Sequence, residues 1–433
     1  MRKIAVCFIL ICAAFSAFGQ TTRREVMATP EKSGGVYYAY PVTDPRFTPA
    51  PEGYEPFYIS HYGRHGSRYL IGEEGYSRPL EIFKRAAEHN VLTPLGLDVL
   101  DRLRTAMDEA RGRDGELTPL GARQHHDIAQ RMYVNNPEVF VDSARITACS
   151  TQVMRCAHSM FNFVMGLKEL NPALNIPMES SFRNMIFLCH SEPESWAFND
   201  NKREPWREEA NKFKAENTNP GRLINTLFSD STYVRRTVNP DRLMWDLYWL
   251  AADMQNMECD VTFYDLFTPE ELFDLWQANN FEFYATNASY PRSQGVNVDN
   301  AKNLLRNIVE TADEYVADGQ RGATLRFGHD GNITPLAALM QFDGFHGYEN
   351  DPAEVYTVWS NFKISPMAAN LQMIFYKNAD NDVIVKMMMN EEDVAIPIST
   401  NIYPFYRWND ARAFFNEVLD TPSSAYFPSR FQK

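Results

Sequence analysis

Three segments of this chain share one pattern, in which a short β-prone run ends at a tight polar turn and an apolar-faced helix follows. In an open α/β sheet, such turns gather at the carboxyl edge of the strands, where ligands bind. The pattern predicts an α/β fold whose site joins distant residues, such as His65 and His329. The β-prone runs are 57–61, 145–149 and 324–327, and the turns are 63–66, 150–151 and 328–331.

Helical periodicity fills most of the remaining chain. One helix begins with Thr118-Pro119, an N-cap residue followed by a proline that suits the first helical position. Ser150 or Thr151 is expected to cap the helix after the second turn. The pattern from about 190 to 318 is almost entirely helical, which predicts a helical insertion. The expected helices include 79–91, 95–111, 119–133, 240–255, 269–277 and 409–419, and further strands are expected at 371–376 and 383–388.

The first residues have the character of an export signal. A basic start at Arg2 and Lys3 is followed by an apolar run from Ile4 to Phe15 and then by small residues. We expect residues 1–19 to be removed and the product to be secreted or periplasmic. The run is shorter than the about 20 apolar residues that a spanning helix requires, so no membrane anchor is expected. The Pro-, Gly- and Ser-rich stretch that follows, up to about residue 55, is expected to be an extended lead-in.

The charge balance excludes a general nucleic-acid-binding protein. The formal net charge is −14, and duplex binding draws most of its affinity from Lys and Arg contacts to phosphate. We therefore expect a small-molecule partner, and an anionic one would need a local basic pocket. The oxidising compartment favours one or two disulfides among the four cysteines that remain after the signal. Three full pairings are open for Cys149, Cys156, Cys189 and Cys259.

The first polar turn carries a histidine between two arginines, in the run Arg64-His65-Gly66-Ser67-Arg68. Positive neighbours and desolvation would lower the pKa of the imidazole and favour its neutral, nucleophilic form. The planar guanidinium groups suit a tetrahedral dianion. Gly66 would let the backbone turn tightly beside the ligand.

The second and third turns add groups that suit the same ligand. Arg155 lies in the first turn of its helix, where free amide donors and the helix dipole already favour an anion. His329 could donate to a phosphate oxygen. Asp330, with a raised pKa, could protonate a leaving oxygen. The three turns together predict a phosphate-ester site that needs no metal ion and no cofactor.

In their order along the chain, these motifs resemble the histidine acid phosphatases, which form branch 2 of the histidine phosphatase superfamily. The resemblance rests on residues 64–68, 150–155 and 328–330, and residues 117–124 resemble another stretch of that family. It spans about 55 to 345, and the ordered motifs are specific as a set.

The resemblance implies a phosphoglycerate-mutase-like α/β sheet domain flanked by helices, with a smaller inserted all-helical domain. We expect the sheet domain at 20–185 and 319–433 and the inserted domain at 186–318. The resemblance also implies that His65 forms a phosphohistidine and that Asp330 protonates the leaving alcohol. The residues that it implies for phosphate binding are Arg64, Arg68, Arg155 and His329.

The expected activity is hydrolysis of phosphomonoesters with an acidic optimum. Inositol phosphates such as phytate are candidate substrates, because the multiple inositol-polyphosphate phosphatases resemble the first motif closely. Those enzymes usually carry His-Ala-Glu where this chain has His329-Asp330, and Leu70 stands where the wider family usually has proline. Two alternatives remain open, a phosphotransferase of the same superfamily and a secreted protein that binds phosphate esters without turnover. The oligomeric state is left open.

Overall fold

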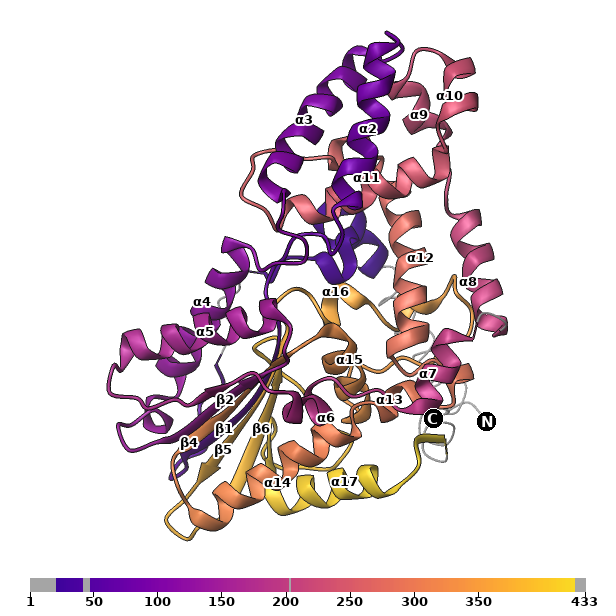
Figure 1. The fold of residues 1–433 in the computed structure, drawn as a ribbon. Coiled ribbons are helices and arrows are strands. Elements are labelled where there is room, and N and C mark those ends of the chain that lie inside the picture. The colour runs from indigo at the N-terminus through magenta and orange to yellow at the C-terminus, as the bar shows by residue number, and fades with distance from the viewer. Residues whose placement is uncertain (1–20, 42–46, 202–203, 425–433) are drawn as a thin grey trace, which may run out of the picture.

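The structure is a computed structural model that describes residues 21–41, 47–201 and 204–424. Figure 1 shows a twisted sheet with helices on both faces, and a group of helices that extends away from the sheet. The expected export signal, residues 1–19, lies outside the described residues. Of the described helices, none has both the length and the apolar character that crossing a bilayer would require.

One sheet contains eight strands, which are β1 (Glu55–Arg64), β2 (Arg145–Ser150), β3 (Met178–Glu179), β4 (Gly322–Gly328), β5 (Asn370–Lys377), β6 (Val383–Met389), β7 (Glu392–Asp393) and β8 (Phe405–Arg407). Their order is β3-β2-β4-β1-β5-β6-β7, and β8 pairs with β6. All five strands predicted from the sequence are confirmed. Their apolar runs are buried, as is typical of strands covered on both faces.

The carboxyl ends of β1, β2 and β4 lie together at one edge of the sheet. Both β1 and β2 run parallel to β4, with Arg64 opposite Gly328 and Ser150 opposite Phe327. The three polar turns therefore follow neighbouring strand ends, as the sequence predicted. β1 continues to Arg64, so the first turn begins at His65 and not at Gly63.

Helices cover both faces of this sheet (Figure 1). One face packs against α4 (Pro119–Asn135) and α5 (Met154–Leu170). The other face packs against α14 (Lys302–Asp318), α15 (Asp330–Leu339) and α17 (Trp408–Asp420). α4, α5, α14 and α17 each bury an apolar stripe, whereas α15 is buried on all sides from Asn332 onward. This burial stabilises the fold by about 25 cal/mol per Å² of apolar surface removed from water.

A second apolar cluster lies within the group of helices that extends from the sheet. It joins α2 (Glu74–Glu88), α3 (Pro94–Ala110), α9 (Gly221–Leu227), α11 (Pro240–Met254) and the first half of α12 (Pro269–Asn287). The predicted helices match α3, α4, α11 and α17 within two residues at each end. The helix expected to start at Pro79 begins at Glu74, so this proline lies inside α2.

The packing bears on the expected domain division, which stays a prediction. The inserted domain was expected at 186–318, yet α2 and α3 share the apolar cluster of α9 and α11. Conversely, α14 lies inside the expected insertion but packs on the sheet. These contacts favour a helical unit built from two separate stretches of the chain.

The lead-in, up to about residue 55, was expected to be extended, and this expectation is wrong for residues 21–37, whereas residues 38–41 and 47–54 contain no helix or strand. Residues 21–28 are helical, and η1 (Pro30–Tyr37) packs against α11 and α12. Tyr248 holds η1 by donating to Ser33 O at 2.5 Å. The remaining short elements are η2 (Pro137–Val139), η3 (Phe182–Asn184), α6 (Met185–Leu188), α7 (Pro193–Asp200), α8 (Pro205–Glu216), α10 (Ser231–Thr237), η4 (Tyr264–Leu266), η5 (Pro291–Ser293), α13 (Val296–Asp299), η6 (Val355–Thr357) and α16 (Asn361–Ile364).

The cap expected at Ser150 or Thr151 is also wrong. The N-cap of α5 is Val153, which makes no side-chain cap. Ser150 Oγ instead lies 2.6 Å from Ser180 Oγ, and Thr151 Oγ1 lies 3.2 Å from a ring nitrogen of His329. The first turn of α5 thus keeps its N–H groups free of a side-chain cap.

The four cysteines are free thiols in the structure, which contradicts the expected disulfides. Cys156 is buried on α5, and its thiol donates to Gly328 O at 3.2 Å. Cys149 lies in β2, whereas Cys259 packs against the apolar cluster of the helical unit. Burial raises the pKa of Cys149 to about 11 and the pKa values of Cys156 and Cys259 to about 12.

Candidate active site

The backbone that follows β1 is fixed by both neighbouring strands. Arg64 N–H donates to Ala369 O at 2.7 Å. His65 N–H donates to Gly328 O at 2.9 Å, and His65 O accepts from Ala368 N–H at 3.0 Å. Backbone hydrogen bonds therefore fix the position of His65 independently of the contacts of its side chain.

The first turn of α4 clamps the same loop from another side. Thr118 caps α4 by accepting from Gly121 N–H at 3.2 Å, and its hydroxyl lies 3.2 Å from Ser67 O. Gln124 Oε1 accepts from Ser67 N–H at 2.8 Å. A Cβ added to Gly66 would collide with the backbone of Gly121, so both glycines permit the close approach. Residues 117–124, which resemble a stretch of the histidine acid phosphatases, therefore support the loop that carries His65.

Ser159 on α5 supports the loop from beneath, and its removal should destabilise the fold. Its buried Oγ accepts from Gly66 N–H at 3.1 Å. We expect Ser159→Ala to lower the free energy of unfolding by about 1–3 kcal/mol, because a buried N–H loses its partner. The control variant Thr105→Ala removes an exposed hydroxyl that donates to Asp101 O. It should change the free energy of unfolding by less than about 0.5 kcal/mol. Urea unfolding measures both, and equal values for the two variants would contradict the assignment.

The imidazole of His65 is neutral and presents one nitrogen as a nucleophile. Nδ1 lies 2.9 Å from Gly66 O, and because a carbonyl only accepts, Nδ1 carries the proton and Nε2 keeps its lone pair. Burial lowers the pKa of His65 well below its ordinary value. The positive charges of Arg64, Arg155 and Arg68 lower this pKa further.

Arg64 is fully buried and faces the site with part of its guanidinium group. Nη1 donates to Val36 O and to Ser365 O, both at 2.6 Å. Nη2 forms an ion pair with Asp330 Oδ2 at 2.9 Å, at an angle outside that of a hydrogen bond. Burial lowers the pKa of Arg64 to about 10, so the group stays charged at neutral pH.

Arg68 follows His65 in the same loop, and Arg155 lies in the first turn of α5. Arg68 Nη1 donates to Tyr69 O at 2.9 Å and to Tyr37 Oη at 3.0 Å. Its guanidinium carbon lies 4.6 Å from the centre of the Tyr37 ring. Arg155 Nη1 makes one long bond, 3.4 Å to Gly115 O. Burial and the charge of Arg68 lower the pKa of Arg155, which indicates that the cations lie close together.

Several guanidinium N–H groups in this cluster have no hydrogen-bond partner among the described residues. They are Nε of Arg64, Nε of Arg68 and Nε of Arg155, and Nη2 of Arg64 has only its ion pair with Asp330. A buried charged donor without a partner costs more than the about 1–3 kcal/mol of a neutral one. An anion with several acceptor oxygens would remove this cost, and the free N–H groups at the start of α5 add to the attraction.

His329 lies across from His65 at the end of β4. The two ring centroids are 5.7 Å apart and the rings are edge to face. Nε2 of His329 lies 3.2 Å from Thr151 Oγ1 and 3.6 Å from Cys156 Sγ. Burial lowers the pKa of His329 to about 4, although the Asp330 carboxylate opposes the shift. The ring is therefore neutral near pH 6 and above.

Asp330 does not have the raised pKa that the sequence led us to expect. Burial raises the pKa of this carboxyl, but the charges of Arg64, Arg68 and His329 outweigh burial and leave the pKa below its ordinary value. Gly331 N–H also donates to Oδ1 at 2.9 Å. A phosphate dianion bound to the same arginines would offset their charge, and the pKa of Asp330 would then rise.

The structure brings all the predicted site residues into one cationic cup around the imidazole. Arg64 and Asp330 form an ion pair, the rings of His65 and His329 are neighbours, and the three arginines act on the pKa of His65. The roles assigned to these residues remain predictions. The members of the cup are Arg64, His65, Arg68, Arg155, His329 and Asp330.

Sequence reasoning missed several residues that hold the cup in place. Asn256, just after α11, accepts from Ser67 Oγ at 2.6 Å and donates to Tyr37 O at 2.9 Å. The Ser67 hydroxyl also accepts from Gln124 Nε2 at 2.9 Å, so it is a structural bridge. Only Gln124 lies in a stretch with a recognisable signal. Nothing in the local sequence distinguishes Asn256 or Tyr37.

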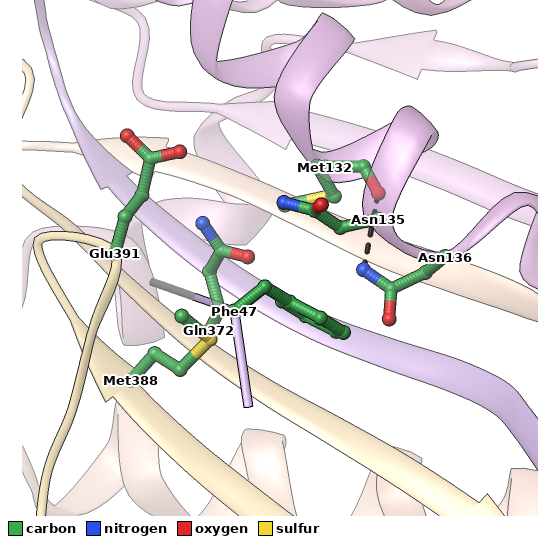
Figure 2. Close-up of a pocket in the computed structure, with 7 residues that line it drawn as sticks. All are labelled: Phe47, Met132, Asn135, Asn136, Gln372, Met388 and Glu391. Atoms are coloured by element: carbon green, nitrogen blue, oxygen red, sulfur yellow. Dashed lines mark hydrogen bonds between the residues drawn. The ribbon is translucent and has the colours of Figure 1, made fainter. Parts of the chain in front are cut away.

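Two pockets differ greatly in what they can hold. A cavity of about 410 Å³ borders His329 and Asp330, which is ample for a small organic group. The pocket in Figure 2 has about 10 Å³, the space of one water molecule. There Asn136 donates to Met132 O at 3.1 Å. The second pocket is too small for a phosphate ester.

Comparison with known proteins gives the chain a family context. The model of the histidine phosphatase superfamily (branch 2) matches residues 63–390, which is more than half of the chain. No curated protein matches the sequence.

Solved structures of similar fold include phosphatases of inositol phosphates. The Bifidobacterium longum multiple inositol polyphosphate phosphatase in complex with inositol hexasulfate has a TM-score of 0.74 and 19% identity, over 89% of this chain and 97% of that one. The phytase from D. castellii has a TM-score of 0.66 and 15% identity, over 90% of this chain and 85% of that one. The Hafnia alvei phytase in complex with myo-inositol hexakis sulphate has a TM-score of 0.54 and 12% identity, over 87% of this chain and 99% of that one. At these identities the likeness concerns the fold alone.

Proposed function

Because this chain belongs to branch 2 of the histidine phosphatase superfamily, we propose that it is an exported acid phosphatase that hydrolyses phosphomonoesters through a phosphohistidine. The observation that carries the proposal is the set of buried guanidinium N–H groups without partners around the neutral imidazole of His65. Such a set binds a phosphoryl group and directs the Nε2 lone pair at phosphorus. Arg64, Arg68, Arg155 and His329 hold the phosphoryl oxygens.

The reaction has two steps that share one site. Nε2 of His65 attacks phosphorus, the bond from phosphorus to the ester oxygen breaks, and Asp330 gives its proton to the departing alcohol. A water molecule then attacks the phosphohistidine and the P–N bond breaks, while Asp330 takes the proton of that water. The charge that develops on the phosphoryl oxygens is met by fixed guanidinium groups, which lowers both barriers. Acidic conditions favour the protonated carboxyl that the first step requires.

Inositol phosphates, phytate among them, are candidate substrates, since relatives of similar fold are inositol polyphosphate phosphatases and phytases. A catalytically inactive binding protein and a phosphotransferase are the alternatives. The first lacks support because the nucleophile, cations and carboxyl all face one another. The expected export signal argues against a phosphotransferase, because the phosphorylated metabolic intermediates on which such an enzyme would act are mainly cytosolic.

Hydrolysis of p-nitrophenyl phosphate in the presence of EDTA tests the proposal. We expect the purified protein to release p-nitrophenol at acidic pH, with a rate that EDTA changes by less than about twofold, because the residues of the cup supply every charge that the reaction needs. Release that requires added Mg²⁺ or Zn²⁺ would contradict the mechanism. Absence of release under all conditions would favour the inactive binding protein.

A further inference from the structure

The last turn of α11 reaches from the helical unit to the loop that carries Arg68. Asn256, just after this helix, accepts from Ser67 Oγ at 2.6 Å. Asp253 lies within the last turn itself and has no exposed surface. Its chain neighbour Met254 belongs to the apolar cluster of the helical unit. Because a buried carboxyl group is costly unless its partners replace the lost hydration, those partners decide in which protonation state it is held.

One partner joins Asp253 to the backbone that follows Arg68. Tyr76 on α2 accepts from Leu70 N–H at 2.9 Å through its Oη, and the same hydroxyl donates to Asp253 Oδ2. Because the amide supplies the proton of the first bond, the proton of the hydroxyl is directed at the carboxyl oxygen. The other carboxyl oxygen, Oδ1, is buried and makes no hydrogen bond in the part of the chain that the structure describes. Asp253 is therefore tied to the loop through Tyr76.

The charged and titratable groups that face Asp253 come from this loop and from two helices. They are Arg68 and Tyr69 in the loop, Tyr76 on α2 and Glu109 on α3. Arg68 is the cation of this group, and its Nε is buried without a hydrogen-bond partner among the described residues. Tyr37, at the end of η1, accepts from Arg68 Nη1 at 3.0 Å. The guanidinium group of Arg68 is thus the positive charge on which Asp253 acts.

The pKa values indicate that these two charges interact. Burial raises the pKa of Asp253 to about 7, although the hydrogen bond from Tyr76 and the charge of Arg68 oppose the shift. Burial lowers the pKa of Arg68, but nearby acidic groups outweigh burial and raise it. These groups are Tyr37, Asp330 and Asp253. Of the two carboxyl groups, Asp253 is the one that changes its charge near neutral pH, because the pKa of Asp330 lies below its ordinary value.

We propose that Asp253 is a positioning residue that acts through Arg68 and makes phosphate binding depend on pH. The protonated carboxyl leaves the charge of Arg68 to the phosphoryl oxygens, whereas the carboxylate competes with them for it. By reciprocity, a bound dianion favours the protonated carboxyl. The affinity of the cup for a dianion should therefore be greatest below about pH 7 and should weaken as the pH rises through that value. The inference rests on the proposed function and adds a second carboxyl group, besides Asp330, that favours acidic conditions.

Sulfate tests this coupling without turnover, because it is a tetrahedral dianion that keeps both charges at acidic and alkaline pH. Isothermal titration calorimetry gives its dissociation constant for the wild type and for Asp253→Asn, which keeps the shape of the side chain and removes its charge. At about pH 8.5 we expect the variant to bind sulfate at least about fivefold more tightly than the wild type, and at about pH 5.5 the two should agree within about twofold. A ratio of the two constants that is the same at both pH values would overturn the inference.

Tyr76→Phe provides a second test that keeps the carboxyl group. It removes the hydroxyl that stabilises the ionised form of Asp253, so the fall in sulfate affinity should remain but should move to higher pH by about one unit. A residue that only supports the loop would change the affinity by the same factor at every pH. If Asp253→Asn does not fold, a midpoint in Tyr76→Phe that equals the wild-type midpoint would overturn the inference.

The matched control is Asp246→Asn on the same helix. Asp246 is also buried, lies about two turns before Asp253, and accepts from Arg78 Nε at 2.8 Å. Its loss should leave the dissociation constant of sulfate within about twofold of the wild type at both pH values, because this carboxylate already has its own cation. A gain at alkaline pH as large as that of Asp253→Asn would overturn the specific role of Asp253.

The outcomes separate this inference from the proposed function. If sulfate binds and p-nitrophenyl phosphate is cleaved while the affinity ratio is independent of pH, the coupling through Asp253 is wrong and the phosphatase stands. If no dianion binds the wild type and no ester is cleaved, the proposed function fails and this inference fails with it.

Discussion

His65→Ala should lower kcat/KM for p-nitrophenyl phosphate by at least about 10⁴-fold, because it removes the nitrogen that accepts the phosphoryl group in the proposed first step. The variant keeps the arginines, so it should still bind phosphate and remain subject to inhibition by it. Initial rates of p-nitrophenol release measure the loss of kcat/KM. Inhibition by inorganic phosphate measures whether the arginines of the cup still bind phosphate. A loss of less than about 100-fold would rule out nucleophilic catalysis by this residue.

The intermediate itself can be captured. Rapid acid-free quenching during turnover of a ³²P-labelled ester should leave label on the wild-type protein and none on His65→Ala. His126→Ala is the matched control, since this histidine lies on α4 and pairs with Glu169 at 2.7 Å outside the cup. Label and rate in that variant should stay within about twofold of the wild type.

The strands and turns that build the site could be predicted because their signals are local. A β-prone run followed by a polar turn, which contains glycine after β1 and β4, marks the ends of β1, β2 and β4, and buried parallel strands contain few polar residues. Parallel strands place their carboxyl ends at one edge, so the juxtaposition of Arg64, Arg155 and His329 followed from topology alone.

The expectations that failed concern individual contacts with elements far away in the sequence. Ser150 or Thr151 was expected to cap α5, but Ser150 Oγ contacts Ser180 and Thr151 Oγ1 contacts the ring of His329. The local sequence does not indicate these partners. The lead-in was expected to be extended, but η1 folds against α11 and supplies Val36 O to Arg64. An apolar stripe defines which face of a helix is buried and says nothing about which element covers it. The docking of α2 and α3 on α9 and α11 was missed for that reason.

The pKa of Asp330 illustrates the same limit for electrostatics. The sequence expectation was a raised pKa, which is the effect that burial alone has on a carboxyl. The net direction is downward because Arg64, Arg68 and His329 face the carboxylate. The sign depends on the distances between charges, which sequence spacing does not contain.

Asp330→Asn should separate esters by the quality of their leaving groups. For an alkyl ester such as myo-inositol monophosphate we expect kcat to fall by about 10²–10⁴-fold, because an alkoxide cannot depart without a proton. For p-nitrophenyl phosphate the first step should be slowed far less, since p-nitrophenolate is a stable anion. Pre-steady-state bursts of p-nitrophenol measure that step separately from the release of phosphate. Equal losses in the burst rate and in alkyl ester turnover would exclude a proton-donor role.

Asp330→Asn should also change the free energy of unfolding, in a direction set by the positive charges that face Asp330. The folded-state pKa of Asp330 is lowered, so its ionised form stabilises the fold above the unfolded pKa of about 3.9, and this contribution is lost as pH falls through the folded pKa. The difference in unfolding free energy between wild type and Asp330→Asn should therefore shrink as the pH is lowered from about 6 to about 3. Asp246→Asn, which breaks the ion pair with Arg78 in the helical unit, should leave the burst and alkyl ester turnover within about twofold. Loss of turnover in that control would mean that a broken ion pair, and not a missing proton, accounts for the effect at Asp330.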